Sequence, residues 1–173
     1  MGLFSTPIRT LDDLFVHTLQ DMYYVENQIV KNLPTMIDKA SDPALREALR
    51  THLLETEGHV SRVEQVFEMH GQPVKGVDCP AIDGILEEAE DIMGDCDDAE
   101  VCDAAMLSAA QAVEHYEITR YGTLIAWSNQ LGKGEIASIL QETLDEEYAT
   151  DDKLTQMATG RDNAKAAAVT EPA

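Results

Sequence analysis

Basic residues are scarce in this sequence: 12 Lys and Arg stand against 33 Asp and Glu, and the formal net charge at pH 7 is −21. Because proteins bind nucleic acids mainly by neutralising phosphates with Lys and Arg, this balance argues against a nucleic acid partner. A similar acidic excess is typical of proteins from high-salt cytoplasms, where salt screens the repulsion among carboxylates. A halophilic protein is therefore expected, with an ordinary acidic protein as the alternative.

Long hydrophobic runs are missing too. No apolar segment approaches the ~18 residues of a membrane-spanning helix, and the first residues lack the apolar core of a secretory signal. The three cysteines, Cys79, Cys96 and Cys102, form no CxxC pair, and no His or Cys lies at the spacing of a zinc site. Since reduced thiols are the default without an export signal, we expect a cytoplasmic protein with no membrane partner.

The residues that are abundant favour helices. Runs of β-branched residues are rare, whereas Ala, Leu, Glu and Gln are common, which indicates an all-α fold. Thr10 followed by Asp12 and Asp13 marks the start of the first helix. Pro43 suits the first turn of the second helix, and Gly71 suits its end. Long helices are predicted over residues 11–36, 43–70, 98–131 and 135–158, and a short helix over residues 82–93.

These helices are expected to form two antiparallel hairpins, which turn at residues 41–43 and 132–134. The connection between the hairpins is long, whereas an up-and-down bundle would need only a short loop there. One long crossover is the connectivity of the ferritin-like fold. The sequence therefore predicts a ferritin-like four-helix bundle over residues 1–159, with a short extra helix in the crossover. Residues 160–173 are expected to form a flexible tail.

A repeat of 91 residues relates the two hairpins and aligns their apolar positions without a gap. Glu26 and Glu55 are 29 residues apart, and so are Glu117 and Glu146. Each of these glutamates lies 14 or 15 residues from the turn of its hairpin, so a rise of about 1.5 Å per residue brings all four to one level. Chance alignment of amphipathic helices is the alternative. Four carboxylates at one level of a bundle are what a ferritin-like di-metal centre needs.

Two more residues complete the predicted site. His59 follows Glu55 by four residues, close to the Glu-then-His element of di-iron helices, in which the spacing is three. The repeat places Thr150 where the second hairpin would need the equivalent of His59, and threonine cannot replace an imidazole. Glu114 shares a helix face with Glu117 and is expected to supply the missing ligand.

The predicted arrangement is a pair of Fe ions, with Mn as the alternative, bridged by two of the glutamates. His52 and Glu142 are the alternatives to the assigned ligands, and Glu147 is expected to point elsewhere. The bridging residues are expected to be Glu55 and Glu146, and the predicted metal ligands are Glu26, Glu55, His59, Glu114, Glu117 and Glu146.

Several segments of the chain resemble the YciF-like stress-response proteins of the ferritin-like superfamily. The resemblance covers residues 8–159, and its most specific parts are 53–67, 79–89, 113–123 and 142–147. It implies a four-helix bundle with an extra helix, a homodimer and a non-haem di-iron centre.

The expected function is oxidation of Fe(II), or reduction of peroxide or O₂, at such a centre. Whether the protein turns over is left open by the sequence. A metal-binding or structural stress-response dimer without turnover is the alternative. Tyr24, Tyr116 and Tyr121 lie near the predicted level, either as relays or, as we favour, as core or rim aromatics.

Overall fold

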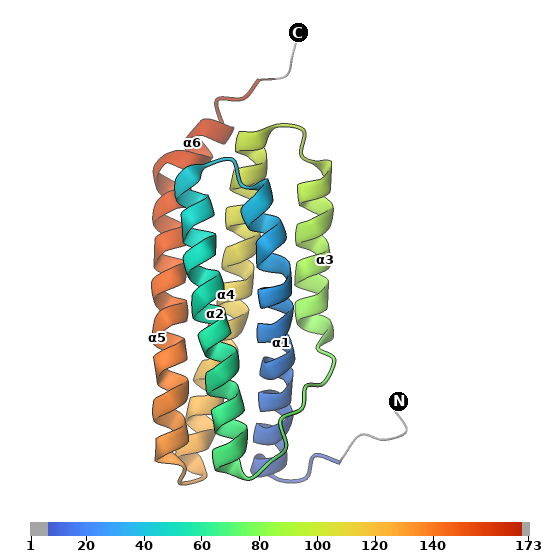
Figure 1. Ribbon diagram of the computed structural model, residues 1–173, viewed down its shortest axis with the longest axis vertical. Helices are drawn as coiled ribbons and strands as arrows, with labels where there is room; N and C mark the ends of the chain where they lie inside the picture. The colour runs from blue at the N-terminus through green and yellow to red at the C-terminus, as the bar shows by residue number, and fades with distance from the viewer. Residues whose placement is uncertain (1–6, 171–173) are drawn as a thin grey trace.

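The computed structural model describes residues 7–170, except for the side chain at position 161. The regular secondary structure of this part is all helical, as predicted, and the longest non-helical connection lies between α2 and α3 (Figure 1). A π-helical turn, η1, extends the last long helix over Ala158–Asp162. The α-helices are α1 Leu11–Lys39, α2 Pro43–His70, α3 Pro80–Asp95, α4 Ala99–Gln130, α5 Gly134–Met157 and α6 Asn163–Ala166.

The helix ends lie at capping residues that can be recognised in the sequence. Thr10 and Asp13 form a reciprocal capping box at the start of α1. The Asp42 side chain accepts hydrogen bonds from the first turn of α2, where Pro43 occupies the first helical position. Gly71 ends α2 in the left-handed conformation, with φ of 70°, which a residue with a Cβ adopts only at a cost.

Two antiparallel hairpins, α1–α2 and α4–α5, make up the bundle, and α3 lies outside it beside α1 and α4 (Figure 1). The chain leaves α2 at one end of the bundle and begins α4 at the other, so residues 71–98 run its full length. This single long crossover confirms the predicted ferritin-like connectivity. The first part of the crossover is held to α1 by a hydrogen bond from the Val77 amide to the Gln20 carbonyl.

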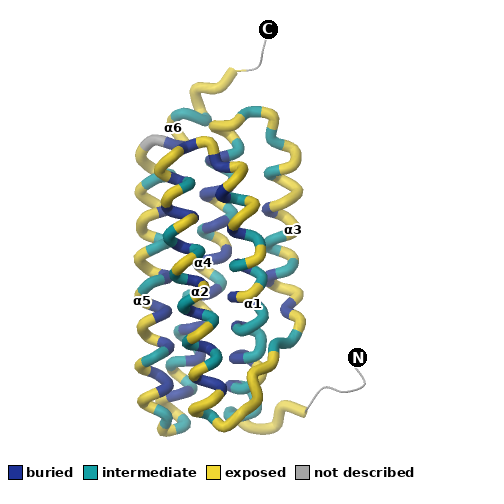
Figure 2. Tube along the Cα trace, viewed as in Figure 1, coloured by how far each residue is buried: buried dark blue, intermediate teal, exposed yellow. Residues whose placement is uncertain are grey.

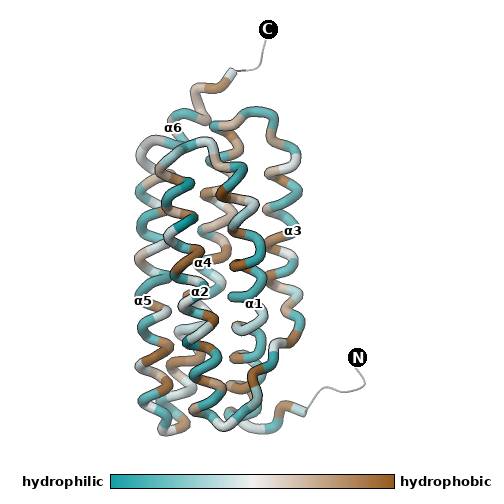
Figure 3. The backbone as a smooth tube through the Cα atoms, in the orientation of Figure 1, coloured by the Kyte–Doolittle hydropathy of each residue, from teal (hydrophilic) through white to brown (hydrophobic). Residues whose placement is uncertain are grey.

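Each long helix buries one stripe whose residues recur mostly at steps of three or four (Figure 2). This spacing keeps one side of a helix toward its neighbours. The residues are apolar toward both ends of the stripes and polar in the middle, so no long helix is uniformly hydrophobic (Figure 3). In α2 the stripe consists of Leu45, Leu49, His52, Thr56, His59, Val63 and Val66.

The C-terminal boundary of the fold differs from the predicted one. Helical structure continues beyond residue 159, through η1 and α6, to Ala166. Asp162 is buried, and Lys165 Nζ lies 2.8 Å from Asp42 Oδ2 at the turn between α1 and α2. Residues 171–173 of the predicted tail lie outside the described part. Among the described helices, none is long and apolar enough to cross a membrane.

Candidate metal centre

Titratable side chains interrupt the apolar core at mid-height of the bundle. Six of them are each at most 5% exposed, and all four long helices contribute. Burial of an ionised group without a partner is costly, so a cluster of this kind needs a compensating charge or bound protons. The members are Glu26, His52, His59, Glu114, Glu117 and Glu147.

The buried stripes determine which side chains reach this level. Glu26 and Glu117 occupy equivalent stripe positions in the two hairpins, 91 residues apart. The same shift relates the buried residues Thr56 and Glu147. The inward positions of each hairpin are thus separated by 30 residues, one more than the predicted spacing of 29.

One group of potential ligands lies between α1, α2 and α5. It consists of Glu26, His59 and Glu147, which each offer one ligand atom within 4.8 Å of the others. His59 Nδ1 lies 3.0 Å from Glu147 Oε1 and 3.6 Å from Glu26 Oε2. Two carboxylates and an imidazole at this spacing match the ligand preferences of Fe and Mn.

A second group lies next to the first, between α2, α4 and α5. It consists of His52, Glu114, Glu117 and Glu147, again with ligand atoms within 4.8 Å of one another. His52 Nε2 lies 3.2 Å from Glu114 Oε1. Glu147 belongs to both groups, so its carboxylate would be shared by cations held in the two of them.

Burial keeps three of the carboxyls from ionising readily. The pKa values of Glu114 and Glu117 lie well above the usual range, first because burial penalises the charged form and second because Glu147 lies nearby. Burial also raises the pKa of Glu26, although His59 partly opposes this effect. Each of these carboxyls would therefore lose its proton readily only when a bound cation takes the place of that proton.

The two imidazoles of the cluster, His52 and His59, differ in the direction of their pKa shifts. Burial lowers the pKa of His52, which leaves a neutral ring with a lone pair for a metal. Burial also acts to lower the pKa of His59, but interactions with Glu147 and Glu26 outweigh it and raise that pKa to about 11. Burial acts to raise the pKa of Glu147, but His59 outweighs it and lowers that pKa. Glu147 and His59 are therefore the charged pair of the cluster.

Most of the buried ligand atoms lack an aligned hydrogen bond within the part of the chain that the structure describes. These atoms are buried in a region where unpaired polar atoms are rare. Six carboxylate oxygens and two imidazole nitrogens are affected: Glu26 Oε2, Glu114 Oε2, both oxygens of Glu117, both oxygens of Glu147, His52 Nδ1 and His59 Nδ1. Such a donor set fits metal ions: Glu114, Glu117 and His52 have lone pairs available, and a cation could take the place of the proton that His59 shares with Glu147.

Four of the six predicted ligands, Glu26, His59, Glu114 and Glu117, belong to these two groups. Glu55 and Glu146 do not. Glu146 is 35% exposed and receives two hydrogen bonds from Arg62, at 2.6 and 2.8 Å. It touches the cluster through His59 Nε2, at 2.9 Å.

The expectation that Glu147 points elsewhere is wrong, and His52, kept only as an alternative, lies in the second group. The buried stripe of α5 contained the signal for Glu147. Leu140 and Leu144 are buried, and Glu147 lies seven and three residues after them, in phase with the core. Glu146 is out of phase by one residue, which is about 100° around a helix.

Of the three tyrosines near this level, one touches the cluster. Tyr121 is fully buried and donates a hydrogen bond to Glu26 Oε1. Tyr24 donates instead to Asp83 of α3, and Tyr116 contacts Cys79 in the crossover. Tyr121 therefore orients a potential ligand, whereas the other two hold the crossover against the bundle.

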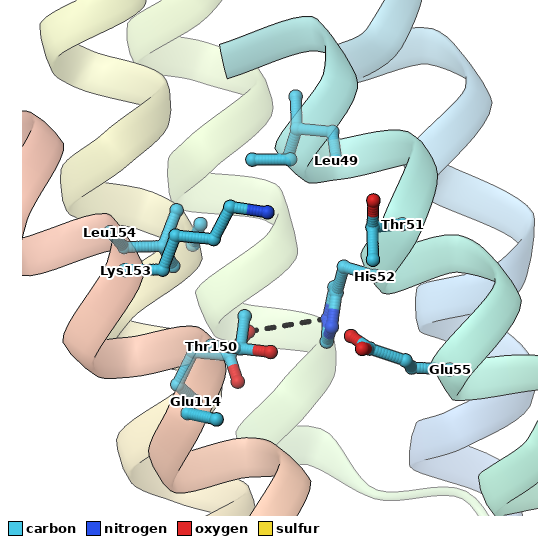
Figure 4. Close-up of a pocket in the computed structure, with 11 residues that line it drawn as sticks. Leu49, Thr51, His52, Glu55, Glu114, Thr150, Lys153 and Leu154 are labelled. Atoms are coloured by element: carbon cyan, nitrogen blue, oxygen red, sulfur yellow. Dashed lines mark ion pairs between the residues drawn. The ribbon is translucent and has the colours of Figure 1, made fainter. Parts of the chain in front are cut away.

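A cavity of about 120 Å³ between α2, α4 and α5 adjoins the cluster. His52 and Glu114 line its inner end, and Figure 4 shows their ion pair there. The side chains of Glu55 and Lys153 point into the cavity from α2 and α5 (Figure 4). Glu55 is thus half-buried beside the site without belonging to either ligand group.

Comparisons with known proteins agree with this architecture. The profile of a family described as "Domain of unknown function (DUF892)" matches residues 10–167. Protein YciF of Escherichia coli (strain K12) is 42% identical over 160 residues, which cover 92% of this chain and 96% of YciF.

Solved structures give the same result. The E. coli stress protein YciF superposes with a TM-score of 0.86 at 41% identity, over 90% of this chain and 99% of YciF. YcfI of Rhodopseudomonas palustris superposes with a TM-score of 0.86 at 49% identity, over 88% of this chain and 98% of YcfI. A protein of Xanthomonas campestris, 21% identical with a TM-score of 0.72, shares the fold. The chain belongs to the DUF892 family, the ferritin-like family of the E. coli stress protein YciF.

Proposed function

We propose that the protein holds two divalent ions, Fe or Mn, in the core of its bundle. Glu147, which both groups of potential ligands share, would contribute to both sites. Glu26 and His59 complete one site, and the second site takes His52, Glu114 and Glu117. The observation that supports this proposal most strongly is the set of six buried carboxylate oxygens that lack aligned hydrogen bonds in the described structure.

Charge balance supports two ions in preference to one. The four glutamates of the cluster carry four negative charges when ionised, and two divalent ions offset all four. A single ion would offset only two of them, so the other two glutamates would have to keep their protons or rely on His59, because uncompensated charge is costly in a low-dielectric core. The charge of Glu146 needs no metal ion, because Arg62 compensates it. Hydrogen bonding to Arg62 is the main reason why the pKa of Glu146 is lowered.

The proposed reaction is oxidation of Fe(II), or reduction of peroxide or O₂. The metal pair would supply the electrons for this chemistry. The protein contributes three things. The apolar ends of the four stripes exclude bulk water, Tyr121 fixes the orientation of Glu26, and Arg62 and Glu146 cover His59 from the outside.

Anaerobic loading with Fe(II) tests the proposal, on protein purified without a His tag. Two ions per chain are expected, followed by consumption of peroxide or O₂ when the oxidant is added. Two bound ions without consumption would leave a metal-binding protein that does not turn over. Failure to bind Fe(II), and Mn(II) in a parallel sample, would refute the metal centre and favour a structural role.

We also propose that the chain forms a homodimer in the cytoplasm, as the resemblance to its family implies. The crossover and α3 lie against α1, where Tyr24 donates a hydrogen bond to Asp83 and the Val77 amide donates one to the Gln20 carbonyl. Leu54 of α2 remains 70% exposed. A sedimentation mass near the 19.0 kDa of one chain at micromolar concentration would argue against the dimer.

A further inference from the structure

The cavity beside His52 connects the cluster with the surface of the bundle between α2 and α5. Its volume of about 120 Å³ has room for several water molecules, and therefore for an ion that keeps part of its hydration shell. Its inner end is formed by His52 and Glu114, which are 5% and 1% exposed. Both still have a polar atom without an aligned hydrogen bond among the described residues.

The outer part of this cavity carries two charged side chains of opposite sign. Glu55 lies on α2, and burial raises the pKa of its carboxyl, with a further contribution from Glu146. Lys153 lies on α5, is exposed, and lowers the pKa of Glu55 by its charge. Thr51 and Thr150 add hydroxyl groups to the polar wall.

A second cavity reaches the same His52–Glu114 pair from the side of α3, but it does not suit an ion. Its volume is only about 30 Å³. Its walls are mainly apolar side chains, which would leave a cation without oxygen ligands. They include Ile29, Leu33, Met36, Leu86 and Val113.

We infer that the larger cavity is the path by which divalent cations reach the metal centre. This inference rests on the proposed function. Glu55 is a transit site on the path: it attracts a hydrated cation at the mouth and passes it to Glu114 and His52. Lys153 opposes this step by its positive charge. Glu55 and Lys153 together therefore set the rate of metal loading, although neither belongs to the final set of ligands.

The opposite charges at the mouth predict opposite effects on loading. Replacing Glu55 with Gln removes an attraction and should slow loading, whereas replacing Lys153 with Ala removes a repulsion and should accelerate it. One charge about 5 Å from a divalent ion changes the rate roughly fifteenfold in water without salt, about fourfold at physiological ionic strength, and less at high salt. Saturation should remain at two ions per chain in both variants.

Stopped-flow absorbance with Co(II) measures the rate of metal loading. The ligand-field bands of Co(II) report its coordination and do not depend on turnover. Metal-free protein is mixed with Co(II), and removal by EDTA is followed afterwards. Two control variants remove charges away from the cavity. Glu57→Gln removes a negative charge on the exposed face of α2, and Lys75→Ala removes a positive charge in the crossover loop. Both controls should load at the wild-type rate, since neither residue lines the cavity.

A steric variant tests the same path without a change of charge. Ala149 is an exposed residue of the cavity wall, so Ala149→Phe should narrow the mouth and slow both loading and removal by EDTA. Ala126→Phe, on the exposed side of α4, is the matched control.

The outcomes separate the two proposals. Wild-type protein that binds no Co(II) refutes the metal centre, and the path with it. Normal saturation with unchanged rates in Glu55→Gln, Lys153→Ala and Ala149→Phe refutes the path alone. A Glu55→Gln protein that saturates below two ions makes Glu55 a ligand, as the sequence predicts, and also overturns its transit role.

Discussion

Glu146 and Glu147 are neighbours in the chain but lie in opposite environments. Glu146 faces Arg62 at the edge of the bundle and is 35% exposed. Glu147 is fully buried, and neither of its carboxylate oxygens has an aligned hydrogen bond in the described structure. One residue of helical rotation therefore separates a surface ion pair from the buried residue that belongs to both groups of potential ligands.

Glu117 should stabilise the metal-loaded protein and destabilise the metal-free one. Both of its oxygens are buried without aligned hydrogen bonds. The Glu117→Gln substitution removes the cost of holding this buried carboxyl, which must take up a proton or carry a charge at about pH 8, so we expect the melting temperature of the EDTA-treated protein to rise by a few degrees. The stabilisation by added Mn(II) should fall sharply. Glu142→Gln is the control, because that side chain is 68% exposed. A Glu117→Gln protein that melts at a lower temperature than wild type without metal would contradict this account.

The stability of the metal-free protein should fall as the pH rises. The pKa values of Glu114 and Glu117 are raised well above 4.5, so above about pH 4.5 the folded state binds more protons than the unfolded state. The pKa of His59 is raised from 6.5 to about 11. It stabilises the folded state fully below pH 6.5 and progressively less as the pH rises toward 11. The lowered pKa values of Glu146 and Glu147 act only at more acid pH.

Thermal melts between about pH 6 and about pH 8 check this prediction. The melting temperature should decrease across this range with EDTA present, and less steeply with saturating Mn(II), since bound metal replaces the protons. A melting temperature that rises with pH in EDTA would show that the buried carboxyls are ionised in the metal-free protein.

At the scale of the elements, most of the fold could be predicted from the sequence. Caps such as Thr10, Asp42 and Gly71 depend on adjacent residues only, so the helix ends were predictable to within a few residues. The length of the crossover distinguished the ferritin-like connectivity from an up-and-down bundle. The level of the site also followed, because height along a helix depends only on distance from the turn.

The rotational phase of the helices was harder to predict at the site itself. A buried glutamate looks polar in a hydrophobicity pattern, so the apolar stripe is interrupted where the ligands lie. Glu55 and Glu146 each precede an inward position, Thr56 and Glu147, by one residue. The pairing of His52 with Glu114 depends on the packing of α2 against α4, which no local pattern specifies.

Asp103 ties the two hairpins together at one end of the bundle. Its carboxylate accepts hydrogen bonds from the Ser41 amide and hydroxyl and from the Asp42 amide, at 2.6 to 2.8 Å. Asp103→Ala would leave the buried Asp42 amide unpaired and remove two more hydrogen bonds from Ser41, so it should reduce the free energy of unfolding by roughly 1–3 kcal/mol. Urea denaturation measures the loss, with the exposed Asp38→Ala as control. Equal midpoints for the two variants would show that this link contributes nothing.

The net charge of −21 acts on the whole molecule. Because 33 acidic residues against 12 basic ones repel one another at low ionic strength, we expect the melting temperature to rise as KCl increases from about 0.05 M to molar levels. The Debye length falls to about 10 Å at 0.1 M salt and to about 3 Å at 1 M, so simple screening is nearly complete before molar levels are reached. A rise that continues at molar KCl would therefore indicate adaptation to high salt. A flat or falling curve would remove the halophilic interpretation.

The most direct test of the metal centre is an anomalous difference map of crystals loaded with Mn(II). The account predicts two peaks in the core of each chain, on either side of Glu147. One peak should lie at about 2.0–2.3 Å from ligand atoms of Glu26 and His59, and the other at such distances from Glu114 and Glu117. Absence of peaks at this level, or peaks held by Glu55 and Glu146 and not by Glu147, would contradict it.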